Sequence, residues 1–298
     1  MPVVTLPNGM VVETPNDKEA SFVYNEIFES GTYLKHGLEI GDGDCVFDVG
    51  ANVGLFSASL AQRHRDLRLV LFEPVPETFA MLERNAERLL GDARVTLVRA
   101  GVSSAPGTAT FESDPSWTID AGAASFLREI EASSRSSRRE AGLLAWNRAA
   151  VDDASRAGVI RASTAARLHA ALSNRVLRPF ALAVIWAIFA VSALNRRRRR
   201  RRIDCELTTI SAAMREHDID RIDFMKVDVE GAEWAALEGI EESDWPRIRQ
   251  LALEVHDVDG RVGRVRALLE DKGYKVVVAQ DEWRLLELQG IRMVYAHR

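Results

Sequence analysis

Cysteine is scarce in this sequence, and an export signal is missing from its start. The chain has 298 residues and only two cysteines, Cys45 and Cys205, which lie far apart and border apolar stretches. This scarcity excludes a disulfide framework and argues against a cysteine metal site, so we expect two reduced, buried thiols. The segment 1–17 contains neither the basic region nor the apolar core of a secretory signal. We therefore expect a cytoplasmic protein.

Charge is unevenly distributed along the chain. The net charge is -5, and 47% of the residues are hydrophobic, enough for a full core. The segment 128–202 alone contains 17 arginines, no lysine and 5 acidic residues, a balance of +12, which leaves -17 for the rest. The sequence thus describes an acidic, enzyme-like body that carries a basic insertion.

From residue 44 onward, short apolar runs alternate with helical periodicity, a pattern typical of βαβ units. Buried strands are expected over 45–49, 68–72, 95–100, 222–227 and 251–255, and a short edge strand over 205–209. Helices are expected over 55–63, 76–90, 210–217, 232–239 and 262–272. The last two elements, 274–279 and 291–296, have no room for a helical crossover between them, so they should pair antiparallel. The sequence predicts a doubly wound, mostly parallel, seven-stranded Rossmann-like sheet with an antiparallel carboxyl-terminal hairpin.

Three parts follow from this pattern. Residues 1–43 form an amino-terminal segment on the lid or substrate side, 44–127 and 203–298 form the α/β domain, and 128–202 form a helical, basic, partly apolar insertion. Within the insertion, the uncharged run 180–194 precedes Asn195 and seven consecutive arginines. At about 1.5 Å per residue this run would span roughly 22 Å as a helix, less than the roughly 30 Å of a hydrocarbon core. A simple transmembrane span is therefore not expected.

A glycine-containing turn follows the first predicted strand. Gly50 and Gly54 allow the backbone to pass close to a ligand and the next helix to pack closely. Nicotinamide and flavin domains use related turns, so the turn alone is weak evidence. Asp48 and Asn52 argue against a dinucleotide, because the middle position there is commonly a glycine that approaches a pyrophosphate. Asp48, Gly50, Asn52 and Gly54 are therefore candidate cofactor-binding residues.

Glu73 ends the second predicted strand, at the carboxyl edge of the sheet. A carboxylate there can accept hydrogen bonds from both hydroxyls of a cofactor ribose. The alternative is a surface acid that begins a loop. We favour the ribose role, because Glu73 follows the glycine turn by one βα unit.

The segment 225–233, MKVDVEGAE, places Asp228 and Glu230 at the same edge of the sheet. Together with DVGANVGLFS and LFEPVPETF, it closely resembles the FkbM-type methyltransferases, and both flanks of the chain resemble the branch found beside polyketide and nonribosomal peptide synthases. The resemblance implies the class I methyltransferase fold and S-adenosylmethionine as cofactor. It also implies O-methylation of a small-molecule hydroxyl acceptor, a natural product or a sugar.

Methyl transfer to a hydroxyl requires a group that removes the hydroxyl proton. The candidates are Asp228, Glu230 and His256, which ends a predicted strand at the same edge. His256 could instead be hydrogen-bonded within a loop, and Asp228 could orient the cofactor's amino group or methionine tail. A divalent metal bound by Asp228, His256 and Asp257 ranks below a metal-free site.

Two further features have open interpretations. The first is an upstream aromatic set that could cover the cofactor as a lid, although simple packing is the more common role: Phe22, Tyr24, Tyr33 and His36. The second is the segment 180–202, which could lie on an anionic membrane surface, pack against the protein or a partner, or contact nucleic acid. We favour the membrane surface. Nucleic acid comes last because the body is acidic.

Two other functions compete with the methyltransferase. One is a nicotinamide-dependent oxidoreductase on a similar sheet, against which Asn52 and the antiparallel hairpin count. The other is a non-catalytic, membrane-associated binding module that keeps the fold and methylates nothing.

Overall fold

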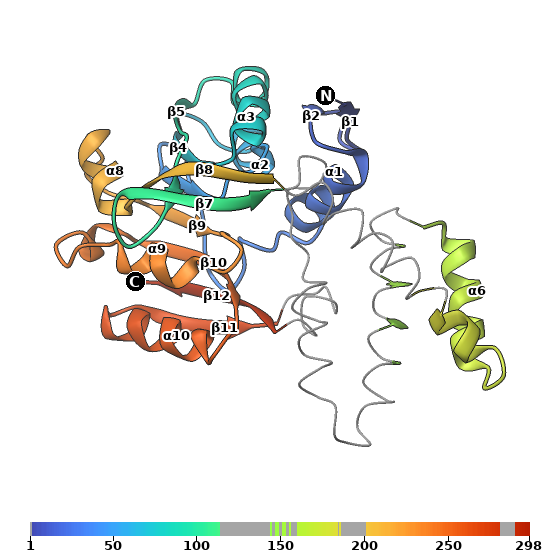
Figure 1. The fold of residues 1–298 in the computed structure, drawn as a ribbon. Helices are drawn as coiled ribbons and strands as arrows, with labels where there is room; N and C mark the ends of the chain where they lie inside the picture. Colours follow the sequence, from blue (N-terminus) through green and yellow to red (C-terminus); the bar gives the residue numbers. More distant parts are fainter. Residues whose placement is uncertain are drawn as a thin grey trace.

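A computed structural model shows the chain arranged around one seven-stranded sheet (Figure 1). The structure describes residues 2–113, 201–280 and 290–298, together with parts of the insertion: 144, 147–148, 151–152, 155, 160–183 and 185. The remaining residues include 114–143 and most of the apolar and arginine runs. The expectations for those residues lie outside the described part of the chain.

The main sheet has the strand order β11-β12-β10-β9-β3-β4-β5. Its strands are β3 (Cys45–Val49), β4 (Arg68–Phe72), β5 (Arg94–Val98), β9 (Phe224–Val227), β10 (Gln250–His256), β11 (Lys275–Ala279) and β12 (Ile291–His297). β12 runs antiparallel to both β10 and β11, and the pairs from β10 through β9, β3 and β4 to β5 are parallel. The predicted sheet and its antiparallel ending are confirmed.

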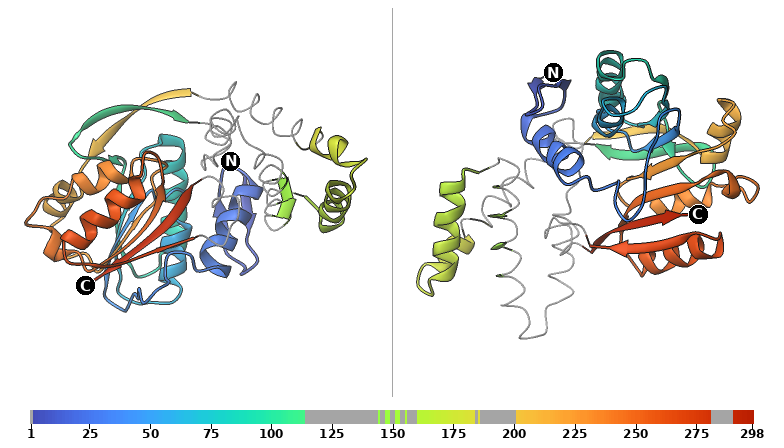
Figure 2. Two further views of the ribbon diagram at one scale, coloured as in Figure 1. Left: turned by 90° about the horizontal axis from the view of Figure 1, so that it is seen from below. Right: turned by 180° about the vertical axis from the view of Figure 1, so that it is seen from behind.

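Helices cover both faces of this sheet, as the two views of Figure 2 show. One apolar cluster joins a sheet face to α2 (Leu55–Ala61) and α3 (Pro76–Leu89). A second cluster joins the opposite face to α8 (Ile210–Glu216), α9 (Glu233–Glu238) and α10 (Arg261–Asp271). Because β3, β4 and β9 are buried on both faces, their sequences are mostly apolar and do not alternate between apolar and polar residues.

The amino-terminal segment lies against the first cluster. It contains the hairpin of β1 (Val3–Thr5) and β2 (Val11–Glu13), the helix α1 (Asp17–Tyr24) and the π-helix η1 (Asn25–Glu29). Asn85 of α3 holds it in place. The Asn85 side chain accepts a hydrogen bond from the Glu13 N–H at 2.8 Å and donates to the carbonyl of Val53 at 2.9 Å. The segment is thereby tied to the turn that follows β3.

The expected edge strand over 205–209 is longer than predicted and belongs to a different sheet. β8 (Arg201–Thr208) pairs with β6 (Gly101–Val102) and β7 (Gly107–Ser113) in a separate three-stranded sheet. Arg201 and Arg202, assigned above to the insertion, are the first two residues of β8, opposite Ser113 and Glu112. The end of the insertion was placed at residue 202 because the arginine run ends there. The backbone pairing of β7 with β8 shows that residues 201 and 202 belong to the domain instead. The insertion therefore leaves and rejoins the domain at the open end of the β7–β8 pair.

The described part of the insertion is helical, as expected. α6 (Ala162–Ser173) lies apart from the main sheet (Figures 1 and 2) and packs on a small apolar core of its own: Val151, Ala165, Leu172, Ala181 and Ile185. Among the described residues, no helix is both long enough and apolar enough to cross a membrane.

Both cysteines are free and buried. The burial expected of both thiols is confirmed.

Candidate active site

The turn after β3 passes against the backbone of the neighbouring strand. Gly50 has φ +79°, and a Cβ atom built on it would lie 1.8 Å from the carbonyl oxygen of Asp228. Gly54 has φ +88°, and its Cβ would lie 2.8 Å from Cδ1 of Leu82 on α3. Only glycine fits at Gly50, because the close atom is backbone that cannot move aside. The close packing predicted at this turn is present, against Asp228 and α3. The close approach of a ligand stays a prediction.

Glu73 lies beside this turn, as the sequence indicated. Its Oε2 accepts a hydrogen bond from the Asn52 N–H at 3.2 Å, and its Oε1 accepts one from the Val75 N–H at 2.9 Å. Asn52 has the left-handed φ of +51°, which turns its N–H toward the carboxylate. Burial raises the pKa of Glu73 to about 7, although the two N–H groups oppose this. Each oxygen has lone pairs left for a ribose hydroxyl, so the cradle fits a nucleoside cofactor.

Asp48 lies beneath the turn and is fully buried. Its Oδ2 accepts a hydrogen bond from the Ser57 hydroxyl at 2.8 Å, and its Oδ1 lies 3.4 Å from Nζ of Lys226. Burial raises the pKa of Asp48, and Lys226 counteracts that rise. The carboxylate therefore supports the turn from inside and does not reach its outer surface.

Lys226 was not among the candidates, yet it connects three of them. Its Nζ donates a hydrogen bond to the Gly50 carbonyl at 2.9 Å and lies 3.3 Å from Oδ2 of Asp228 as well as close to Asp48. The side chain is 5% exposed. Burial lowers the pKa of Lys226, and the nearby carboxylates raise it by more, so the ammonium keeps its proton. The sequence signal that could have identified Lys226 is its position as the one charged residue within the buried strand FMKV.

Asp228 lies at the end of β9 and faces the amino-terminal segment. Its Oδ2 accepts a hydrogen bond from the Tyr33 hydroxyl at 2.9 Å, and its side chain is 25% exposed. Burial and the surrounding carboxylates raise the pKa of Tyr33 well above its ordinary value, so the phenol remains a donor. Of the proposed lid residues, Tyr33 is therefore the one with a described hydrogen bond to a candidate catalytic group.

The other aromatic residues of that set pack elsewhere. Tyr24 stacks on Phe28 with 4.8 Å between ring centroids, and the His36 ring lies 4.8 Å from that of Tyr295. Phe22 packs against Ile291. Tyr24, His36 and Phe22 therefore take part in packing, the more common role of such aromatic residues.

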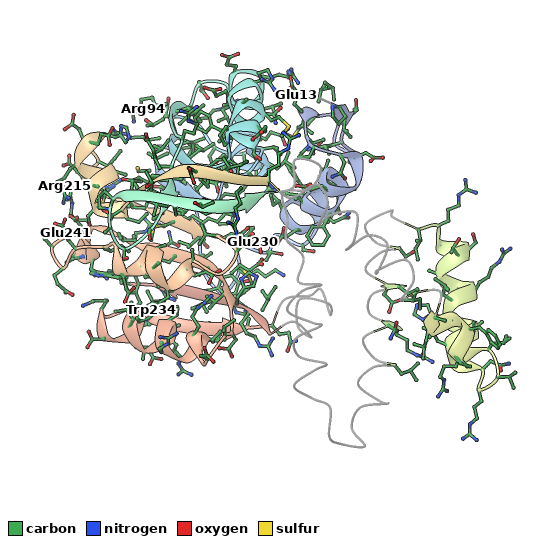
Figure 3. The ribbon with its side chains drawn as sticks, viewed as in Figure 1. Glu13, Arg94, Arg215, Glu230, Trp234 and Glu241 are labelled. Carbon is green, nitrogen blue, oxygen red and sulfur yellow. The ribbon has the colours of Figure 1, made fainter. Side chains whose placement is uncertain are left out.

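His256, the last residue of β10, lies between two carboxylates. Its Nδ1 is 3.0 Å from Oε1 of Glu233, and its Nε2 is 3.4 Å from Oε2 of Glu230. Burial lowers the pKa of His256, but hydrogen bonds to both carboxylates outweigh this and raise it to about 11. The imidazole is therefore protonated at neutral pH and cannot accept a further proton in this arrangement. Figure 3 shows Glu230 on the side of the domain where α1 lies, away from Arg215 and Glu241.

Glu233 is a second residue of the site that was not predicted from the sequence. It is fully buried, and it accepts hydrogen bonds from the Gly231 N–H at 2.5 Å and from Nη1 of Arg261 at 2.8 Å. These bonds support the left-handed turn formed by Glu230 (φ +48°) and Gly231 (φ +102°). An acid at the start of a helix resembles an ordinary surface residue, so only its burial in the fold reveals this role.

The three residues weighed as metal ligands have separate partners. Asp228 binds Tyr33, His256 binds Glu233, and Oδ1 of Asp257 accepts a hydrogen bond from the Val262 N–H at 3.1 Å. Within the ranges that the structure describes, no group of three His, Cys, Asp or Glu side chains has an arrangement suited to a metal ion.

The seven-stranded sheet with its antiparallel ending has the class I methyltransferase fold. The chain belongs to the FkbM methyltransferase family, since residues 48–276 match the Methyltransferase FkbM domain. It is 34% identical over 276 residues to the 31-O-demethyl-FK506 methyltransferase FkbM of Streptomyces tacrolimicus, covering 93% of this chain and 90% of that one. The protein is thus an S-adenosylmethionine-dependent methyltransferase, which decides against the oxidoreductase weighed above.

The chain is also similar to other proteins over most of its length. The chain is 30% identical to part of the AMB antimetabolite synthetase AmbE of Pseudomonas aeruginosa, where the match covers 93% of this chain and 12% of AmbE. It is 26% identical to the methyltransferase sdnD of Sordaria araneosa, covering 89% of this chain and 86% of sdnD. Among solved structures, the methyltransferase FkbM of Methylobacillus flagellatus KT aligns with a TM-score of 0.44 at 14% identity, over 92% of this chain and 48% of that one.

Proposed function

We propose that this enzyme transfers a methyl group from S-adenosylmethionine to a hydroxyl oxygen of a small natural product or sugar. The observation that supports it most directly is the 34% identity, over nearly the full length of both chains, with an enzyme named for methylating an oxygen of FK506. The carboxylates at the carboxyl edge of β9 and β10 supply the polar groups that a hydroxyl acceptor needs.

In this proposal the turn after β3 and Glu73 hold the cofactor. Glu73 accepts hydrogen bonds from the ribose hydroxyls, Asn52 orients Glu73, and Gly50 and Gly54 give the backbone its close path. Asp48 keeps the turn in place from beneath. S-adenosylmethionine, when bound, supplies a methyl group on a positively charged sulfur that is already activated for displacement.

Asp228, Glu230 and His256 form the acceptor side. Their position beyond the turn, at the ends of β9 and β10, is where an oxygen could align with the transferred methyl group. His256, protonated between two carboxylates, orients Glu230 in the resting enzyme. We expect His256→Ala to lower turnover by about 10-fold or more, a loss at the low end of general acid–base effects, with little change in cofactor affinity.

Two measurements test the function. Calorimetry should show binding of S-adenosylmethionine and none of NADH. Radiolabelled methyl transfer should then be measured with a panel of hydroxyl compounds that includes 31-O-demethyl-FK506 and free sugars. Binding without transfer to any member would favour the non-catalytic binding module weighed above.

We also propose that the protein is cytoplasmic and that its insertion rests on an anionic membrane surface through the segment 180–202. Three apolar side chains just before this segment and at its first residue are exposed, with exposed fractions of 74% for Val176, 50% for Leu177 and 69% for Phe180. Such side chains, followed by a run of arginines, suit an interface with anionic headgroups.

The test compares liposome pelleting of the wild-type chain with that of a Val176→Ser, Leu177→Ser, Phe180→Ser variant. These substitutions leave residues 201 and 202 unchanged, so β8 stays paired with β7. The variant should remain in the supernatant and still bind S-adenosylmethionine. Equal pelleting of both chains, or none of either, would contradict the membrane contact.

A further inference from the structure

The carboxylates around the acceptor side differ in one respect, which is whether they already have a partner. Asp228 binds Tyr33 and Lys226, and Glu230 and Glu233 both bind His256. Glu254 of β10 is different. Within the described part of the chain, its carboxyl group takes part in no hydrogen bond and no ion pair.

The Glu254 residue is also buried. Its exposed fraction is 7%, and it lies two residues before His256, opposite Met293 of β12. Among the described residues, the fully shielded side-chain atoms that lack a partner do not include the carboxyl oxygens of Glu254, so these oxygens keep access from outside. A carboxylate with accessible oxygens and no protein partner at this edge can accept a hydrogen bond from a ligand.

We propose that Glu254 receives the hydrogen bond, and then the proton, of the acceptor hydroxyl. This inference rests on the proposed O-methyltransferase function and deepens it by naming the base. A hydroxyl group donates through its single O–H, and the oxygens of Glu254 are free to accept that hydrogen bond. Asp228, Glu230 and His256 then act as the charged surroundings of the base.

The step balances in atoms and charge. The acceptor oxygen forms a bond to the methyl carbon as the bond from that carbon to sulfur breaks, and the bonding electron pair stays on sulfur. The hydroxyl proton moves to the Glu254 carboxylate and leaves later to water. A cationic sulfur and an anionic carboxylate both become neutral, and because charges are costly in a buried site, this loss of charge favours the forward step.

The charges that face Glu254 come from several elements. Burial raises the pKa of Glu254 well above its ordinary value, as do the carboxylates of Asp228, Glu26 and Glu230, while His256 lowers it. The phenol of Tyr33 also faces it. In the cofactor-free enzyme these groups therefore favour the protonated form of Glu254. A nearby positive sulfur favours the ionised form, so binding of the cofactor should release that proton.

The first test measures proton release. Calorimetric titrations with S-adenosylmethionine and with uncharged-sulfur S-adenosylhomocysteine, each in two buffers of different ionisation enthalpy, give the protons released on binding. The wild-type enzyme should release up to about one more proton with the sulfonium than with the thioether. Glu254→Gln should abolish that difference, and the control Glu238→Gln, on the exposed side of α9, should retain it.

The second test measures turnover with the hydroxyl panel, starting with 31-O-demethyl-FK506. Glu254→Gln should lower kcat by about 10²-fold or more while the Kd for S-adenosylmethionine changes little, and Glu254→Asp should keep part of the activity. Proton release or kcat equal to wild type in Glu254→Gln would overturn the assignment. A wild-type enzyme that methylates no member of the panel contradicts the proposed acceptor class instead, and the proton-release comparison still decides about Glu254.

Discussion

The imidazole Nδ1 of His256 lies 3.0 Å from Oε1 of Glu233, and this contact joins the end of β10 to the first residue of α9. Glu233 is fully buried and Arg261 binds its other oxygen, so the carboxylate cannot turn away. The orientation of the histidine ring is thus decided by a residue that has no contact with solvent.

The first prediction concerns the protonation of His256. Its folded-state pKa of about 11 lies above the ordinary 6.5, so the stability contributed by protonation is fully present below pH 6.5 and is lost as the pH rises through 11. An NMR titration should show a protonated ring up to pH 9. Glu233→Gln should move the midpoint toward 6.5, and Glu238→Gln should not. A wild-type midpoint near 6.5 would contradict the paired geometry.

The second prediction concerns cofactor affinity. Glu73 has a pKa of about 7 in the cofactor-free enzyme, and ribose hydroxyls are better bound by the ionised carboxylate. The Kd for S-adenosylmethionine should therefore fall by up to about 10-fold between pH 6 and pH 8. Glu73→Gln should weaken binding and remove this pH dependence, whereas Glu83→Gln, exposed on α3, should behave as wild type.

The same residue predicts an opposite effect on stability. A folded-state pKa of about 7 lies above the ordinary 4.5, so the stability from the protonated form is present below pH 4.5 and is lost as the pH rises through 7. At pH 8 Glu73→Gln should raise the free energy of unfolding by up to about 3 kcal/mol. Denaturant titrations at pH 5 and pH 8 measure this. A less stable variant at pH 8 would show that the carboxylate is better solvated than its burial indicates.

The third prediction concerns Lys226. Lys226→Met leaves the buried carboxylate of Asp48 without its cation, so the free energy of unfolding should fall by about 3–5 kcal/mol. Adding Asp48→Asn to that variant should recover part of the loss, because the uncompensated charge is then removed. Additive losses in the double variant would argue against a direct pairing of the two groups.

The fourth prediction concerns Gly50. A methyl group there would overlap the Asp228 carbonyl, so Gly50→Ala should either prevent folding or destabilise the chain by more than about 3 kcal/mol and abolish cofactor binding. The matched control is Gly91→Ala. Gly91 also has a positive φ (+56°), but its Cβ would meet no atom within 4 Å, so the cost should be only about 1 kcal/mol. Similar losses at both sites would mean that backbone conformation alone matters.

Much of the fold could be predicted from the sequence because its signals are local. Strands such as β3 and β4, buried on both faces, appear as mostly apolar runs, and α3 carries its apolar residues on one side. The contact between Asn52 and Glu73 was predictable too, since both follow consecutive strands of a parallel sheet and must meet at one edge. By contrast, β8 was placed wrongly, because strand partners depend on pairing across a long insertion.

The sequence by itself determined the family and the positions along the chain of the strands and helices around the main sheet, since each of these follows from patterns within a few consecutive residues. Only the tertiary structure decided which charges are paired. Lys226 and Glu233 became part of the site because burial brings them against partners distant in the chain. Among the residues that the structure describes, Glu254 has no hydrogen-bond partner. Which charges are paired depends on desolvation and on distance in space, which no local pattern encodes.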